Sequence, residues 1–226
     1  MLKYLLLLSL VCFWACGQPA APAPAPTEKI VWEFTESLNG AKEHSVGTPD
    51  GKIEMTAGAE TDFFIEPGAP PYDKSNAPLL LRTIDNTKPF TFSFKTTPVH
   101  NVMYDAGMAF LYVDNRHWLK FAFEADERMN KRAVTVKTRD FSDDNNHDVI
   151  NAAAAYLKIS SDTKAVGFYY SVDGQQWQLV RVFKNEYPAQ LKVGIGTQSP
   201  AGKGTKAIFE DLKLTEESVK DFRMGI

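Results

Sequence analysis

The chain has 226 residues, 44% of them hydrophobic, which is enough to bury one sizeable core. Its formal net charge is −3; without residues 1–15, whose only charged side chain is Lys3, 24 basic residues stand against 28 acidic ones, a balance of −4. This balance gives no general attraction to nucleic acid or to anionic membranes, so we expect no nucleic-acid partner. Both cysteines, Cys12 and Cys16, lie near the start, so the rest of the chain has no thiol for a disulfide, a metal or a nucleophile.

Residues 1–15 have the pattern of an export signal. Lys3 precedes an apolar run from Tyr4 to Trp14, and a small residue, Ala15, stands before the expected cleavage site. The run is too short to remain as a membrane-spanning helix. Its ending resembles a bacterial lipoprotein signal, which implies that Cys16 carries a lipid. We therefore expect an exported protein of the bacterial cell envelope that touches the membrane only through this anchor; secretion or a free periplasmic protein is the alternative.

Residues 16–28 predict a tether. The repeat Pro22-Ala23-Pro24-Ala25-Pro26 lacks the apolar surface that folding requires, and proline stiffens the extended chain. At ~3.1 Å per residue, ten such residues reach about 30 Å. That length suits a domain held away from a membrane.

Residues 29–214 predict one all-β domain. Apolar or alternating runs bounded by turn residues indicate strands at 30–34, 51–56, 61–65, 79–82, 89–95, 105–113, 118–124, 133–139, 166–172, 177–183, 191–198 and 207–214. Phe90, Phe92 and Phe94 all face one way, which is typical of a half-buried antiparallel strand. Asp173-Gly174 favours a tight hairpin turn. Many short strands without an amphipathic helix predict an antiparallel β-sandwich, and we expect a monomer.

Four segments are less regular. Residues 67–78 hold four prolines and form either a functional rim or a crossover. Residues 140–148 predict a polar loop, and 152–157 fit a helical turn or the entrance of a strand. In 215–226, Thr215 is suited to cap a short C-terminal helix, with an irregular tail as the alternative.

The stretch from Trp118 to Glu124 points to a site. Residues alternate across a strand, so Leu119, Phe121 and Phe123 share a core face while Trp118, Lys120, Ala122 and Glu124 share the other. A ring, an ammonium and a carboxylate in one row are an unusual set to leave on a sheet that receives nothing. The next predicted strand, 133–139, has Lys137 and Arg139 on one face, and we expect Arg139 to join this row.

Several motifs resemble the family called domain of unknown function 1349, which is similar to regulation-of-enolase proteins and is placed among the concanavalin A-like lectins and glucanases. The matching residues are Thr61-Asp62-Phe63-Phe64, Asn76-Ala77-Pro78, Tyr104-Asp105-Ala106-Gly107, Trp118-Leu119-Lys120 with Glu124, Val136-Lys137-Thr138, Ser142-Asp143, Tyr170-Ser171-Val172-Asp173-Gly174 with Trp177 and Arg181, Val193-Gly194-Ile195-Gly196 and Ser199-Pro200. The resemblance implies a jelly roll with one concave face, and a fold that hosts both sugar binders and sugar cleavers. It departs at Asp144, where the family has Trp.

Our first hypothesis is a noncatalytic domain that binds or senses a carbohydrate or another polar small ligand. Trp118 would supply an apolar platform, and Lys120, Glu124 and Arg139 the hydrogen-bonding groups. The resemblance adds Tyr104 and Asp105 as ligand-binding candidates. The alternative for the charged residues is simple pairing across strands on a solvated face.

Two further hypotheses belong to other classes. A glycoside hydrolase needs two facing carboxylates, and Glu124 with Asp126 could be considered; we expect Asp126 to lie in a turn, so we predict no catalytic residue. The third is a structural or protein-interaction domain. The acidic run 140–148 lacks the spacing of a calcium loop, and the four histidines are scattered, so no metal or other cofactor is expected.

Overall fold

A computed structural model of the chain describes residues 34–68 and 71–226, which form strands and loops and no helix. The strands are β1 Glu36–Leu38, β2 Ser45–Gly47, β3 Ile53–Gly58, β4 Phe63–Ile65, β5 Asp73–Ser75, β6 Leu79–Asp85, β7 Phe90–Pro98, β8 Ala106–Asp114, β9 His117–Ala125, β10 Lys131–Arg139, β11 Phe141–Val149, β12 Ala155–Ser161, β13 Ala165–Ser171, β14 Gln178–Lys184, β15 Gln190–Gln198 and β16 Gly204–Thr215. Accordingly, no helix in these residues is long and apolar enough to cross a membrane.

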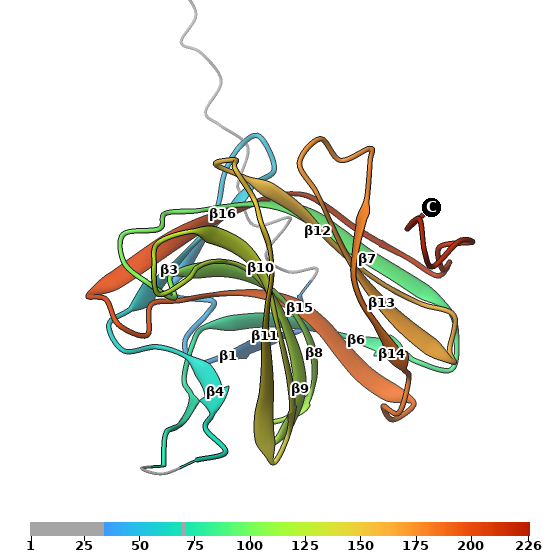
Figure 1. Cartoon of the computed structure of the whole chain (residues 1–226), viewed down its shortest axis with the longest axis horizontal. Helices are drawn as coiled ribbons and strands as arrows, with labels where there is room; N and C mark the ends of the chain where they lie inside the picture. Colours follow the sequence, from blue (N-terminus) through green and yellow to red (C-terminus); the bar gives the residue numbers. More distant parts are fainter. Residues whose placement is uncertain (1–33, 69–70) are drawn as a thin grey trace, which may run out of the picture.

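Two seven-stranded antiparallel sheets pack face to face (Figure 1). The first has the order β1-β6-β15-β8-β9-β10-β11, and the second β14-β13-β12-β7-β16-β3-β2. β4 and β5 pair only with each other and form a separate hairpin. The predicted antiparallel β-sandwich is confirmed, with a jelly-roll fold like that of its structural neighbours.

The main core fills the space between the two sheets. Phe90, Phe92 and Phe94 of β7 point into it from the second sheet, as their alternation predicts. Phe121 of β9 meets them from the first sheet and stacks on Phe168 of β13, with ring centroids 5.1 Å apart. Burying such large rings removes most of their apolar surface from water, which is the principal stabilisation of the sandwich.

A second hydrophobic cluster lies on the outer face of the first sheet. Its largest side chain is Trp118, and Phe63 of the β4–β5 hairpin covers it edge-on, with ring centroids 5.6 Å apart. Phe110 of β8 packs against both rings. The hairpin therefore gives this sheet a core on its second face, but only beneath the part that it covers.

The less regular segments resolve as follows. Residues 141–149 form β11, the last strand of the first sheet, so the predicted polar loop is wrong. Apart from Ser142, the side chains of this end strand are not buried, so it needs no apolar alternation. Residues 152–157 lead into β12 as a strand entrance, and 216–226 form the tail, without a helix. The predicted signal, Cys16 and the tether lie outside the described residues, as does most of the strand expected at 30–34.

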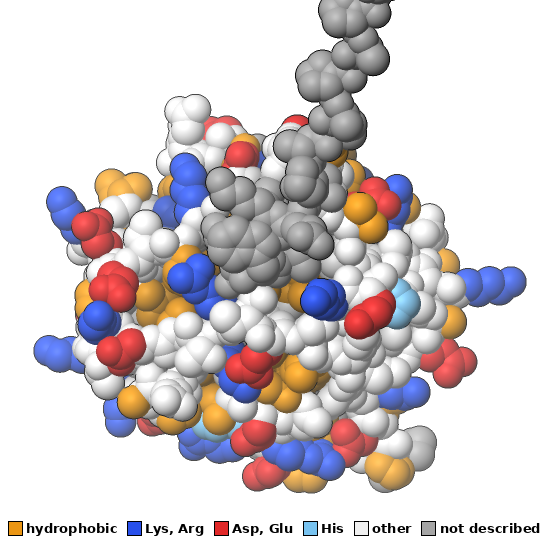
Figure 2. All heavy atoms as spheres, turned by 180° about the vertical axis from the view of Figure 1, so that it is seen from behind, with side chains coloured by type: hydrophobic (Ala, Val, Ile, Leu, Met, Phe, Trp, Pro, Cys, Tyr) orange, Lys and Arg blue, Asp and Glu red, His pale blue; other side chains and the backbone are white. Residues whose placement is uncertain are grey.

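Charge on the surface is mixed. On the described part of the face in Figure 2, lysine and arginine side chains alternate with aspartate and glutamate, so charge of one sign does not gather there. Acidic side chains do gather inside a pocket on the outer face of the first sheet.

Candidate functional site

The outer row of β9 is divided between two environments. Trp118 has no exposed surface, because Phe63 seals it from above. The expectation that Trp118 offers a platform to a ligand is therefore corrected: its ring belongs to the second hydrophobic cluster. Two and six residues further along the same row, Lys120 and Glu124 instead line an open pocket.

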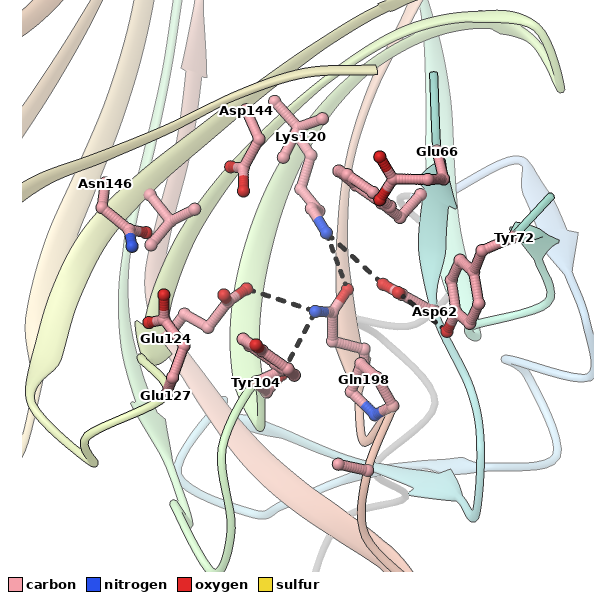
Figure 3. Close-up of a pocket in the computed structure, with 15 residues that line it drawn as sticks. Asp62, Glu66, Tyr72, Tyr104, Lys120, Glu124, Glu127, Asp144, Asn146 and Gln198 are labelled. Atoms are coloured by element: carbon pink, nitrogen blue, oxygen red, sulfur yellow. Dashed lines mark hydrogen bonds and ion pairs between the residues drawn. The ribbon is translucent and has the colours of Figure 1, made fainter. Parts of the chain in front are cut away.

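This pocket, which we call the Lys120 pocket, has a volume of about 400 Å³. That is within the ~300–1,000 Å³ typical of small-molecule sites. β9, β10 and β11 supply its floor and one wall, the β4–β5 hairpin supplies the opposite wall with Phe64 and Tyr72, and the loop after β15 closes the end with Pro200. Figure 3 shows the labelled polar groups converging on this space.

Lys120 is the central polar group, and only 3% of it is exposed. Its Nζ donates to Gln198 Oε1 at 3.1 Å and to Asp62 Oδ1 at 3.5 Å. Asp62 is held in turn by the amide of Phe63 at 2.8 Å and by the hydroxyl of Tyr72 at 3.2 Å. A buried ammonium thus has one carboxylate at the limit of ion pairing and one amide oxygen as its protein partners.

Glu124 lies at the other end of this network. Gln198 Nε2 donates to its Oε2 at 3.2 Å and to the carbonyl oxygen of Tyr104 at 3.1 Å, so the amide of Gln198 links the carboxyl to Lys120. Burial raises the pKa of Glu124 to about 8, partly offset by the charge of Lys120 and reinforced by Asp62. At neutral pH this side chain is mainly a neutral carboxylic acid, which can donate one hydrogen bond as well as accept.

The remaining wall is acidic. Val136 pairs with Lys120 on one side and Asp144 on the other, so the three lie in a row across β9, β10 and β11. Asn146 stands beside Val134 in the same way. Although Asp144 is exposed at the sheet edge, its carboxyl turns into the pocket (Figure 3), and burial raises its pKa while Lys120 opposes the rise.

Tyr104 and Asp105 have different roles. Tyr104 lines the pocket and adopts a left-handed backbone with φ of 70°, which is uncommon for a side chain of this size. Asp105 is fully buried and does not line the pocket. It accepts hydrogen bonds from the hydroxyl of Ser199 at 2.6 Å and from the amide of Asn101 at 2.9 Å, so it holds the turn that presents Tyr104.

Arg139 does not belong to the site, which corrects our expectation. Antiparallel partners share a face, and Arg139 pairs with His117, whereas Val136 pairs with Lys120. Arg139 therefore lies on the opposite face of β10, at its exposed end, where its Nη2 is 3.6 Å from Glu186. Arg139 is three residues from Val136, which lines the pocket, and side chains an odd number of residues apart on a strand point to opposite faces of the sheet.

Asp126 is in the turn after β9, as predicted. Its carboxyl accepts hydrogen bonds from Arg132 Nε at 2.6 Å and Asn130 Nδ2 at 3.1 Å, which hold its pKa far below the usual range although burial opposes this. It does not face Glu124 across the pocket. Within residues 34–68 and 71–226, no three His, Cys, Asp or Glu side chains are placed to hold a metal ion.

Sequence reasoning located Lys120, Glu124 and Tyr104 but missed half of the pocket. Asp62, Tyr72 and Gln198 reach it from segments 48 to 78 residues away from Lys120. The sequence offered one signal for these residues, the family motif that contains Asp62. That motif did not indicate that Asp62 contacts Lys120.

The geometry defines a jelly-roll β-sandwich with a polar pocket on the outer face of one sheet. A family model described as a protein of unknown function (DUF1349) matches residues 38–217, so the chain belongs to this family. A search of curated proteins finds no match.

Solved structures share the fold at low sequence identity. A functionally unknown protein from Saccharomyces cerevisiae has a TM-score of 0.74 at 22% identity, over 84% of this chain and 99% of that one. The GH43 protein BlXynB from Bacillus licheniformis has a TM-score of 0.59 at 14% identity, over 74% of this chain and 33% of that one. A xylan beta-1,4-xylosidase from Bacillus halodurans has a TM-score of 0.57 at 14% identity, over 74% of this chain and 33% of that one. The present chain therefore spans about a third of the length of each of these two Bacillus proteins.

Proposed function

We propose that the protein is an envelope-tethered domain that binds a carbohydrate, or a similar polyhydroxylated small ligand, in the Lys120 pocket without cleaving it. The carrying observation is the burial of Lys120 at the floor of an open pocket. Desolvating an ammonium is costly, and a single carboxylate at 3.5 Å gives limited compensation. Apolar side chains would serve a purely structural role in this position better.

The surrounding groups suit such a ligand. A polyol needs closely spaced donors and acceptors beside flat apolar surface. Lys120 provides a donor, and Asp62 and the amide oxygen of Gln198 provide acceptors, while the rings of Phe64 and Tyr72, 6.4 Å apart, line the opposite wall. The likeness to GH43-related structures shows the fold alone and does not carry this proposal.

Removing the buried ion pair tests the binding role. In Lys120→Met with Asp62→Asn, both charges disappear, so no uncompensated charge remains and the protein should fold with near wild-type stability. Losing charge-assisted hydrogen bonds should weaken binding of a sugar from a neutral and amino-sugar panel by about tenfold or more, measured by calorimetry. Arg139→Ala is the control and should bind normally. Unchanged affinity in the double variant, or no binding across the panel, would overturn the proposal.

The tether rests on residues 1–28 alone. Cys16→Ser should abolish incorporation of labelled palmitate and release the protein from the membrane fraction, because the thiol carries the lipid. If labelling persists in this variant, or never occurs in the wild type, the anchor is excluded and secretion or a periplasmic location takes its place.

A second candidate is a glycoside hydrolase in which Glu124 donates a proton to the leaving oxygen. It is favoured by one observation, the raised pKa of about 8, since a general acid must keep its proton at neutral pH. Release of reducing sugar that disappears in Glu124→Gln would support it, and release that survives would exclude Glu124 as the acid.

A further inference from the structure

The Lys120 pocket has far more acid than base. One ammonium faces five carboxyl groups, and two tyrosines complete the titratable set: Asp62, Glu66, Tyr72, Tyr104, Lys120, Glu124, Glu127 and Asp144. Even with Glu124 neutral and Lys120 compensating Asp62, three carboxylates have no cation in the lining. A pocket that only had to bind neutral hydroxyl groups would not need this surplus.

Three of the five carboxyl groups gather on one side of the pocket, whereas Glu66 lies on the side of Asp62 (Figure 3). Lys120 is directed toward Gln198 and Asp62, whereas Glu124, Glu127 and Asp144 gather on the other side of the pocket (Figure 3). We call these three side chains the acidic wall. The wall is built from three separate places, β9, the turn that follows it, and β11, and the strand register brings them together.

One group in this wall is both buried and incompletely paired. Glu124 is only 6% exposed, and Gln198 donates to its Oε2. Among the described contacts, its Oε1 has no hydrogen-bond partner, and the side chain lines the pocket. This oxygen keeps accessible surface in the pocket, so a hydrogen-bonding group of a ligand can reach it there.

Resting on the proposed function, we infer that the ligand is a polyhydroxylated molecule with a free amino group, such as an amino sugar. Its ammonium would lie against the acidic wall, and its hydroxyl groups would meet Lys120, Gln198 and Asp62. An anionic sugar would be repelled by the wall. A divalent cation is a poor substitute, since the carboxyl groups of the described residues are not placed as metal ligands.

Protons should accompany this binding. A cation beside Glu124 favours its ionised form, so it lowers the pKa of a group that is mainly protonated at pH 7. Binding of an ammonium therefore releases protons near neutral pH, and affinity should rise from about pH 6 to 7, where the amino sugar keeps its own proton while the ionised fraction of Glu124 grows. The other groups facing it are Lys120, Asp62, Asp144 and Glu127, and burial also raises the pKa of Asp144.

Calorimetry of the full chain with three matched probes tests this inference. D-glucosamine carries an ammonium where D-glucose carries a hydroxyl and N-acetylglucosamine an amide. At pH 7 we expect glucosamine to bind about tenfold or more tightly than the other two, a difference of about 1.4 kcal/mol. Only glucosamine should give a binding enthalpy that differs between two buffers of different ionisation enthalpy, because only it displaces a proton.

Neighbouring residues on one strand supply matched variants. Asp144→Asn should reduce the preference for glucosamine to within about threefold of glucose, since it removes one charge of the acidic wall. Asp143→Asn is the control, because Asp143 lies on the other face of β11 beside Arg181. Equal affinity for glucose and glucosamine would overturn the inference and leave the proposed function intact. Failure of all sugars, including the wider panel above, would overturn both.

Discussion

Two ends of one row on β9 show how the same face of a sheet can become either core or site. Trp118 and Lys120 are neighbours on that face, and both are almost completely buried. Over Trp118 the hairpin places the ring of Phe63, which closes a dry apolar cluster. Over Lys120 the same hairpin contributes Asp62 and Tyr72 and leaves a pocket.

The difference shows that accessibility is decided by what covers the strand rather than by the strand itself. A tryptophan on a sheet face attracts attention as a ligand platform, but its large apolar surface also makes it the best group to cover. An apolar ring over the lysine would leave its buried ammonium without polar partners, so polar groups line this end of the row.

The largest expected effect concerns the open end. The pKa of Glu124 rises from an ordinary value of 4.5 to about 8 on folding. Its contribution to the free energy of unfolding is therefore fully present below about pH 4.5 and is lost as pH rises toward 8, on the order of 4–5 kcal/mol at about 1.36 kcal/mol per unit. In Glu124→Gln this loss should be absent from urea unfolding curves measured between pH 4.5 and 8.5.

A control glutamate separates this effect from general titration. Glu54 is partly exposed on β3 and pairs with Lys206, so Glu54→Gln should keep the wild-type dependence on pH. If Glu124→Gln and wild type instead lose the same stability over this range, the open end of the row does not hold a protonated carboxyl, and the contrast with the sealed end weakens.

A somewhat smaller effect is expected at the sealed end. Phe63→Ala removes the ring that covers Trp118, and deleting a buried phenylalanine costs roughly 3–5 kcal/mol in comparable cores. The free energy of unfolding should fall by about this amount in urea, whereas Val46→Ala, at an exposed position, should change it by less than about 0.5 kcal/mol. A loss below about 1 kcal/mol for Phe63→Ala would mean that the hairpin does not seal this end.

Most of the sandwich follows from local patterns. The alternation of Phe90, Phe92 and Phe94 identifies β7 because one of its faces is buried and the other is not. Gly174 has a φ of 72°, as expected where Asp173-Gly174 turns the chain between β13 and β14. Such patterns fail for Phe141–Val149, because only Ser142 of this strand is buried and no apolar face imposes a period.

By alternation alone, the candidate site was predicted only as far as a single strand reaches, and the family resemblance added Tyr104. Lys120 and Glu124 share a face by simple alternation, which requires no knowledge of neighbours. Gln198 and Asp62 contact Lys120 from distant segments, so no local spacing connects them with it. Arg139 was misassigned because its face depends on the register between β9 and β10, and a shift of one residue in that register reverses the answer.

β11 stands at the end of its sheet, and it supplies Asp144 and Asn146 to the pocket. Side chains alternate along it, so inserting one residue ahead of Asp143 would exchange its two faces and replace both Asp144 and Asn146 in one step. The ladder with β10 already contains a bulge near Arg132, and an end strand can absorb another without disturbing β8 or β15. A single insertion in β11, or replacement of this one strand, should therefore change which ligands the pocket prefers.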